Sequence, residues 1–140
     1  MTTVIDSNVL IALWDVDDVL NREALAALDR ALAQGKLVVP APVFAELLAF
    51  PQRTEGFLQG FFRETSIAVD WDLAENVWKA AGRAFGAYAA RRQRGQEPRA
   101  RQVLVDFVIG AYAEQNGCRL LTFDRGIYRA AFPKLTLLAP

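Results

Sequence analysis

The sequence feature that most constrains the fold is an apolar run at 103–113 that contains a single carboxylate, Asp106. The run is long enough for about three turns of helix, and Gly117 is a typical C-terminal stop for such a helix. An ionised Asp on a helix that is apolar almost all round is costly unless a cation, a proton or several hydrogen-bond donors compensate it. We therefore expect a compensating partner beside Asp106.

The rest of the chain alternates short apolar segments with helical patterns. The expected strands are 3–5, 36–39, 66–71, 119–123 and 135–138. The expected helices are 9–14, 21–34, 40–50, 55–63, 72–92, 103–113 and 127–132. This alternation predicts a parallel sheet of four or five strands with helices on both faces, a three-layer α/β/α sandwich. With 140 residues and 53% hydrophobic composition, the chain predicts one domain, 1–140, with a sizeable core.

Local signals refine three of these elements. In helix 21–34 the residues Leu25, Leu28 and Leu32 share one face, and Gly35 is the expected stop. The stretch from Asp72 to Glu75 has the spacing of a capping box. Residues 93–98, rich in Gly, Pro and charged side chains, form the expected flexible loop.

Three further acids lie in apolar sequence or at the end of a strand: Asp6, Glu46 and Asp124. Asp6 and Asp124 each follow an expected strand, and the carboxyl ends of parallel strands meet at one edge of a sheet. Singly, each acid has an ordinary explanation, because Asp6 and Asp124 could cap helices and Glu46 and Asp106 could be partly exposed. Together they are explained by one shared cation.

The residue types indicate which cation. The chain has no histidine, and a carboxylate-rich oxygen site favours Mg²⁺ or Mn²⁺ over zinc or copper. Without such an ion the acids would repel one another and bind protons. A water bound to the ion can attack a phosphodiester, which predicts a hydrolase. Ser7 and Thr122 could orient carboxylates or a water. The single Cys118 is expected to be a small buried residue.

Four segments carry a resemblance to a known family. Residues 4–11, 42–48, 106–113 and 121–124 resemble, in order and spacing, the four acidic motifs of PIN domains, and the chain as a whole is similar to VapC-type toxins of toxin–antitoxin systems. The departures are Gly110, where alanine is frequent, and an unusual richness in arginine between 91 and 101.

The resemblance implies an endoribonuclease that depends on Mg²⁺ or Mn²⁺, forms a homodimer and is inhibited by a small VapB-type antitoxin whose C-terminal segment lies over the groove leading to the acids. The catalytic residues that it implies are Asp6, Glu46, Asp106 and Asp124. Asp6 and Asp106 would bind the metal directly, and Asp124 and Glu46 would bind it directly or through water.

Charge and hydropathy limit the cellular compartment and the binding partners that we expect for this protein. Sixteen basic and sixteen acidic residues cancel, so there is no overall attraction to nucleic acid. Arginines nevertheless gather in one segment, which either meets RNA or an antitoxin or is simply solvated: Arg83, Arg91, Arg92, Arg94, Arg99 and Arg101. The apolar runs are too short to cross a bilayer, the N-terminus lacks the pattern of a secretory signal, and one cysteine suits a reducing compartment. We expect a soluble cytoplasmic protein with no membrane partner.

Two other functional readings compete with a nuclease. Aspartyl-phosphate chemistry is disfavoured because Asp6 lacks the second acid two residues on, and because no lysine follows the last strands where a receiver domain needs one, since Lys134 precedes the final expected strand. A non-catalytic PIN-fold module that binds RNA or protein remains the alternative. Several large apolar side chains belong either to the core or to a groove for an antitoxin helix or a second copy: Trp14, Leu20, Leu25, Leu28, Phe57, Leu58, Phe61 and Phe62.

Overall fold

The computed structural model describes residues 1–94 and 104–138. Its five strands form one parallel sheet in the order β3-β2-β1-β4-β5, with β1 at the centre. The strands are β1 (Thr2–Ile5), β2 (Lys36–Pro40), β3 (Ala68–Asp70), β4 (Arg119–Leu121) and β5 (Leu137–Leu138). The register pairs Val4 with Val38 on one side and with Leu120 on the other. The parallel sheet expected from the sequence is confirmed.

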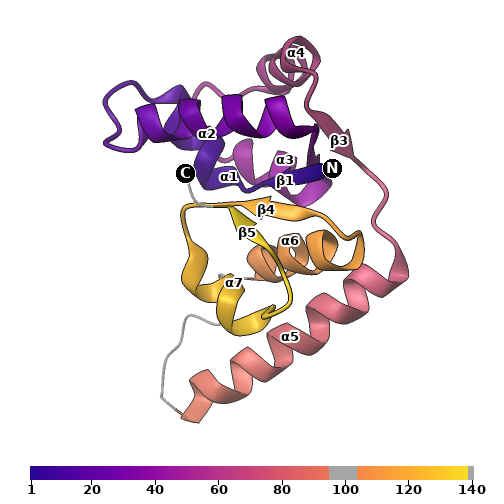
Figure 1. Cartoon of the computed structure of the whole chain (residues 1–140). Helices are drawn as coiled ribbons and strands as arrows, with labels where there is room; N and C mark the ends of the chain where they lie inside the picture. The colour runs from indigo at the N-terminus through magenta and orange to yellow at the C-terminus, as the bar shows by residue number, and fades with distance from the viewer. Residues whose placement is uncertain (95–103, 139–140) are drawn as a thin grey trace.

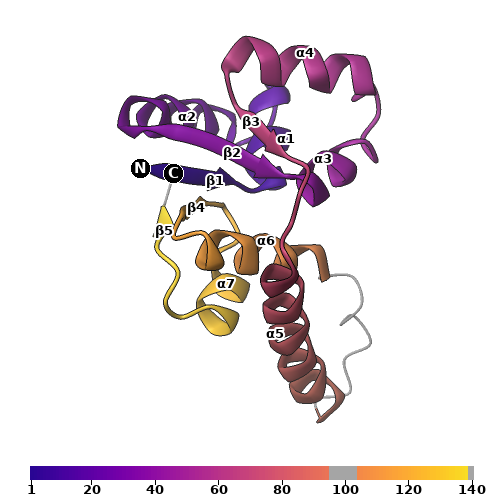
Figure 2. The same ribbon diagram turned by 90° about the vertical axis from the view of Figure 1, so that its right-hand side faces the viewer.

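Helices cover both faces of this sheet. They are α1 (Ser7–Trp14), α2 (Asn21–Gln34), α3 (Ala41–Leu47), α4 (Glu55–Thr65), α5 (Glu75–Arg94), α6 (Leu104–Gln115) and α7 (Arg125–Ala131). In both views α1, α2 and α4 lie on one side of the sheet and α6 and α7 on the other, while α5 packs against α6 and points away (Figures 1 and 2). The predicted three-layer α/β/α arrangement is confirmed. None of the described helices is both long and apolar enough to span a bilayer.

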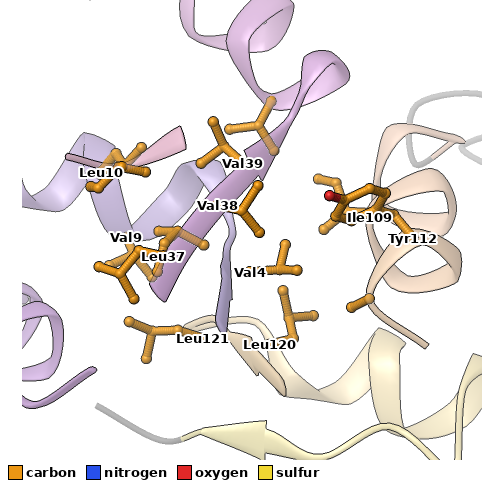
Figure 3. Packing of buried hydrophobic residues seen from close by; sticks show 14 of the residues in the cluster. Val4, Val9, Leu10, Leu37, Val38, Val39, Ile109, Tyr112, Leu120 and Leu121 are labelled. Carbon is orange, nitrogen blue, oxygen red and sulfur yellow. The ribbon is translucent and has the colours of Figure 1, made fainter. Parts of the chain in front are cut away.

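The core lies on both faces of the sheet because successive strand residues point to opposite sides. Val4 and Leu120 point toward Ile109 on α6, whereas Leu37 and Leu121 point toward α1 (Figure 3). All of these side chains are buried. Because the strands are buried on both faces, their sequences are nearly unbroken apolar runs. The same burial fixes the ends of β1 and β4 next to each other.

Two glycines end helices as the sequence predicts. Gly117 follows α6 with φ +65°, the left-handed conformation that glycine adopts without strain. Gly35 follows α2 and has the carbonyl of Met1 so close that a Cβ would collide with it. The same carbonyl accepts a hydrogen bond from the Lys36 amide at 3.1 Å. The turn at Gly35 therefore leads into β2, and the turn at Gly117 leads into β4.

Helices α6 and α7 approach each other most closely at Gly110. A Cβ at this position would lie 2.5 Å from Cδ2 and 3.1 Å from Cζ of Phe132, and nearer still to Cε2. Gly110 is one turn beyond Asp106 on α6, and Phe132 is one turn beyond Tyr128 at the end of α7. The absent side chain thus sets the spacing between these two helices.

Some local expectations are wrong. The buried face of α2 consists of Ala24, Ala27, Leu28 and Ala31, whereas Leu25 and Leu32 are exposed. Small side chains on this face allow α2 to pack closely against α1 and β2. The other large apolar residues named above divide into three groups. Leu58 and Phe62 are buried in the core, Trp14 and Phe61 are half-buried, and Leu20 and Phe57 are exposed.

Three boundaries also differ from the expectation. Helix α3 ends at Leu47, not near Phe50, because the residue before Pro51 avoids the helical conformation. Helix α5 begins at Glu75, and the Asp72 amide donates to Asp70 Oδ1 at 3.0 Å in a turn, so Asp72 caps nothing. The loop expected at 93–98 begins within α5, and the remainder lies outside the described residues.

Cys118 is half-buried and its thiol donates to the Asn116 carbonyl at 3.6 Å, so the expectation of a fully buried cysteine is wrong. Burial raises the pKa of the thiol, which suits a structural and not a nucleophilic residue.

Candidate active site

Asp6 is the centre of a buried polar network at the carboxyl end of β1. It is 2% exposed and occupies the N-cap of α1, with Oδ1 accepting the Ser7 amide at 2.8 Å. Its Oδ2 accepts the hydroxyls of Thr122 and Tyr128, each at 2.8 Å, and the Asn8 side-chain amide at 3.4 Å. Asp6 is therefore both the helix cap that the sequence allowed and the hub of a larger site.

Each of the other three acids is joined to Asp6 through one intermediate residue. The Ser7 hydroxyl contacts Oδ1 of Asp6 at 3.5 Å and donates to Oε1 of Glu46 on α3. The Tyr128 hydroxyl lies 3.5 Å from Oδ1 of Asp106 on α6.

Asp124 is linked through its backbone. Its amide donates to Thr122 Oγ1 at 3.0 Å, and the same hydroxyl donates to Asp6. Although Asp124 occupies the N-cap of α7, its side chain makes no capping bond. The structure thus brings the four predicted acids around one place, and the capping explanation is wrong for Asp124.

The topology explains why these residues meet. From β1 the chain crosses to β2 on one side, whereas β4 pairs with β1 on the other, so the direction of winding changes between β1 and β4. In open parallel sheets the crevice at such a switch point, beyond the carboxyl ends of the strands, is the usual binding site. The Asp6 amide donates to the Leu121 carbonyl at 3.0 Å, which places Thr122 beside Asp6.

The pKa values of Asp106 and Asp6 are raised where the negative charges are crowded. Burial, followed by the charges of Asp6, Glu46 and Asp124, raises the pKa of Asp106 to about 7, against a smaller opposing effect of the Tyr128 hydrogen bond. Burial also raises the pKa of Asp6, although the hydrogen bonds from Thr122, Tyr128 and Ser7 favour its charged form. All four acids therefore interact electrostatically, and the charged cluster lacks a compensating cation from the described protein.

The chemistry of the donors fits a hard divalent cation. Within residues 1–94 and 104–138 the one ion pair joins Lys79 to Glu75 on α5, and none reaches the four acids. In the same part of the chain no group of three or more His, Cys, Asp or Glu side chains is placed so that it could hold a metal ion. The four acids nevertheless interact, and their mutual repulsion is what a divalent cation would relieve.

Sequence reasoning missed two participants. Asn8 donates to Thr122 Oγ1 at 3.3 Å and accepts the Phe123 amide at 3.2 Å, so it ties the start of α1 to the loop after β4. Tyr128 joins Asp6 to Asp106. The available signal for Tyr128 was its position one helical turn after Asp124, which puts both residues on the same side of α7. The proposed orienting residues Ser7 and Thr122 do contact Asp6.

The amino-acid sequence matches the family model of the PIN domain over residues 3–133. The chain belongs to the PIN-domain family. No curated protein sequence matches this PIN domain significantly.

Solved structures with the same fold cover nearly all of this PIN domain. VapBC-1 from nontypeable Haemophilus influenzae is 18% identical with a TM-score of 0.63, over 99% of this chain and 98% of that one. VapBC2 from Rickettsia felis, bound to a DNA fragment from its promoter, is 14% identical with a TM-score of 0.61, over 100% and 99%. FitAcB from Neisseria gonorrhoeae is 21% identical with a TM-score of 0.62, over 97% and 96%. These identities support a common fold.

Proposed function

We propose that this PIN domain is a metal-dependent endoribonuclease and the toxin of a toxin–antitoxin pair. The observation that carries the proposal is a network that links the carboxylates of Asp6, Glu46 and Asp106 and is joined by the Asp124 backbone amide, with all four charges close enough to interact. Membership of a family whose members are generally nucleases supports the reaction class. The VapBC and FitAcB structures that share the fold support a role within a toxin–antitoxin pair.

In this proposal Asp6 and Asp106 bind Mg²⁺ or Mn²⁺ directly, while Glu46 and Asp124 bind it directly or through water. A cation of this kind keeps several water ligands, so a complete cage of protein donors is unnecessary. When bound, it would supply an activated water and stabilise the charge that develops on the phosphoryl and leaving oxygens.

The protein's own residues orient these acids. The Ser7 hydroxyl donates to Glu46 Oε1 and lies 3.5 Å from Asp6 Oδ1, so it links the two acids. Thr122 accepts from Asn8 and from the Asp124 amide while donating to Asp6, so both its lone pairs and its proton are used. A hydroxyl satisfied in this way has a fixed orientation, and the Asp6 carboxylate is fixed with it.

Two apolar surfaces support protein partners. Trp14 and Phe50 line a pocket of about 300 Å³, at whose edge the Arg53 guanidinium lies over the rings of Trp14 and Phe57. We assign this surface to an antitoxin helix. Trp71 and Trp78, 60% and 52% exposed, line a second pocket of about 390 Å³ beside α3, which we assign to a second copy of the chain. A cytoplasmic location belongs to the same proposal.

Cleavage of RNA by purified protein tests the function. Asp6→Asn and Asp106→Asn should each lower the Mn²⁺-dependent cleavage rate by roughly 1,000-fold, because the loss of a metal ligand removes several kcal/mol of transition-state stabilisation. Asn keeps the size of Asp and the hydrogen bonds at the α1 cap, so circular dichroism should show an intact fold. Sequencing the ends of the products would identify the bond that is cut.

Asp29→Asn on the exposed face of α2 is the matched control and should cleave like the wild type. Full activity in either site variant would refute the nuclease assignment. Binding of RNA by the wild type without any cleavage would support the alternative of a non-catalytic module.

A further inference from the structure

Tyr128 is the one aromatic residue whose polar atom reaches two of the four acids in the described structure. Its side chain is 1% exposed on α7, and its hydroxyl donates to Asp6 Oδ2 at 2.8 Å. The same hydroxyl lies 3.5 Å from Asp106 Oδ1, a contact at the limit of a hydrogen bond. One proton therefore faces two carboxylates, one from the end of β1 and one from α6.

The packing around Tyr128 fixes this hydroxyl in place. Helices α6 and α7 lie side by side in both views (Figures 1 and 2). One turn further along, Phe132 packs directly on Gly110, and its amide donates to the Tyr128 carbonyl at 2.8 Å. The Tyr128 ring is buried and its carbonyl is bonded to Phe132, so both the side chain and the backbone of Tyr128 are confined.

Counting acceptor sites shows what the contact does to each carboxylate. Oδ2 of Asp6 accepts close hydrogen bonds from Thr122 and Tyr128, which occupy both of its lone pairs. Oδ1 of Asp6 accepts one close bond, from the Ser7 amide; the Ser7 hydroxyl lies 3.5 Å away and gives its one proton to Glu46, which leaves a lone pair of Oδ1 for another partner. On Asp106, Oδ1 faces the tyrosine, whereas Oδ2 accepts no hydrogen bond within the described residues.

We propose that Tyr128 is a positioning residue that holds Asp6 and Asp106 with one oxygen each turned away from the tyrosine and toward a divalent cation. This inference rests on the metal site of the proposed function. It assigns Tyr128 no contact with the cation or with RNA. Its role is to hold Asp6 and Asp106 in orientations that leave one oxygen of each available to a cation.

A purely structural role would be the simpler explanation, since any buried tyrosine needs a hydrogen-bond partner. The chain offers a control for it. Tyr112 on α6 is 6% exposed, and its hydroxyl donates to Asp70 Oδ2 at 2.7 Å, a carboxylate outside the four-acid cluster. Tyr128→Phe and Tyr112→Phe each remove one buried hydroxyl that donates one close hydrogen bond to a carboxylate, so Tyr112→Phe controls for the loss of that bond.

The test is a titration of the purified chain with Mn²⁺ alone, in which electron paramagnetic resonance measures the free ion. Outer hydrogen-bond partners of metal ligands typically contribute about 10- to 100-fold to affinity. Tyr128→Phe should therefore raise the Kd for Mn²⁺ by about 10-fold or more, whereas Tyr112→Phe should leave it within about two-fold of the wild type. Melting temperatures in chelator should fall by similar amounts in the two variants, which confirms that both still fold.

An unchanged Mn²⁺ affinity in Tyr128→Phe would overturn the positioning role. Tighter binding would overturn it too, because the hydroxyl would then be a competitor of the cation. An equal loss in Tyr112→Phe would point to general destabilisation and would contradict it as well. If the wild type itself binds no Mn²⁺ saturably, the metal site of the proposed function fails first, and that result is distinct from the other three.

Discussion

Replacing Gly110 by alanine should destabilise the protein, although alanine is the better helix residue. An alanine Cβ would lie 2.5 Å from Phe132 Cδ2, where ordinary carbon contacts begin at about 3.5 Å, so the ring must retreat by about 1 Å. Phe132 is buried and packs against Phe107, so it has little room to do so. Overpacking of this kind costs typically about 1–3 kcal/mol.

The size of the effect follows from two opposed contributions. Alanine in place of glycine stabilises a helix interior by about 1 kcal/mol, and a forced shift of a buried ring costs near the upper end of the overpacking range, about 3 kcal/mol. The net loss should be about 2 kcal/mol, which corresponds to a fall in Tm of about 6 °C for a domain of this size. Gly82 on α5 has open space where its Cβ would be, so Gly82→Ala should gain about 1 kcal/mol.

Thermal and urea unfolding of the two variants check the opposite signs. The double variant Gly110→Ala/Phe132→Leu should recover part of the loss, because the smaller side chain makes room for the new methyl group. A Gly110→Ala protein as stable as the wild type would refute the argument that this glycine is required by contact with α7.

Three further predictions concern charge and assembly. The folded state raises the pKa of Asp106 from 3.8 to about 7, so between these pH values the folded protein holds a proton that the unfolded chain has lost. The free energy of unfolding in chelator should therefore fall as pH rises from about 4 to about 7. Asp106→Asn should show a smaller fall in urea melts across this range and be the more stable protein at pH 8, and an unchanged pH dependence would contradict the crowding of charges. Light scattering should give twice the chain mass of 15.5 kDa for the wild type and a single chain mass for Trp78→Glu. A monomeric wild type would count against the homodimer. A co-expressed antitoxin should be retained by the wild type and lost from Phe57→Glu, and its retention there would exclude the assigned surface.

The sequence predicted the architecture well because its signals were local and strong. Uninterrupted apolar strands imply burial on both faces, and Gly35 and Gly117 stop helices through positive φ angles, a local property of the backbone. The expected meeting of Asp6 and Asp124 followed from one topological rule, that parallel strands end at a common edge. Glu46 and Asp106 were added to them by the argument of one shared cation.

What the sequence could not predict depends on partners that are distant along the chain. The buried face of α2 is made by alanines, and only the closeness of its neighbours decides that Leu25 is left outside. Tyr128 resembles any core aromatic until its hydroxyl is seen between two carboxylates. The significance of Gly110 likewise becomes visible only once Phe132 is placed against it.

The span of the Asp6 network bears on the timing of synthesis. Asp6 emerges early from the ribosome, yet its two close hydroxyl partners are 116 and 122 residues further along. At about 5–20 residues per second, several seconds of translation separate the acid from the groups that orient it. Whatever chemistry these acids perform, a nascent polypeptide cannot complete the arrangement before residues 122 and 128 have been made. An incomplete translation product should therefore be inert.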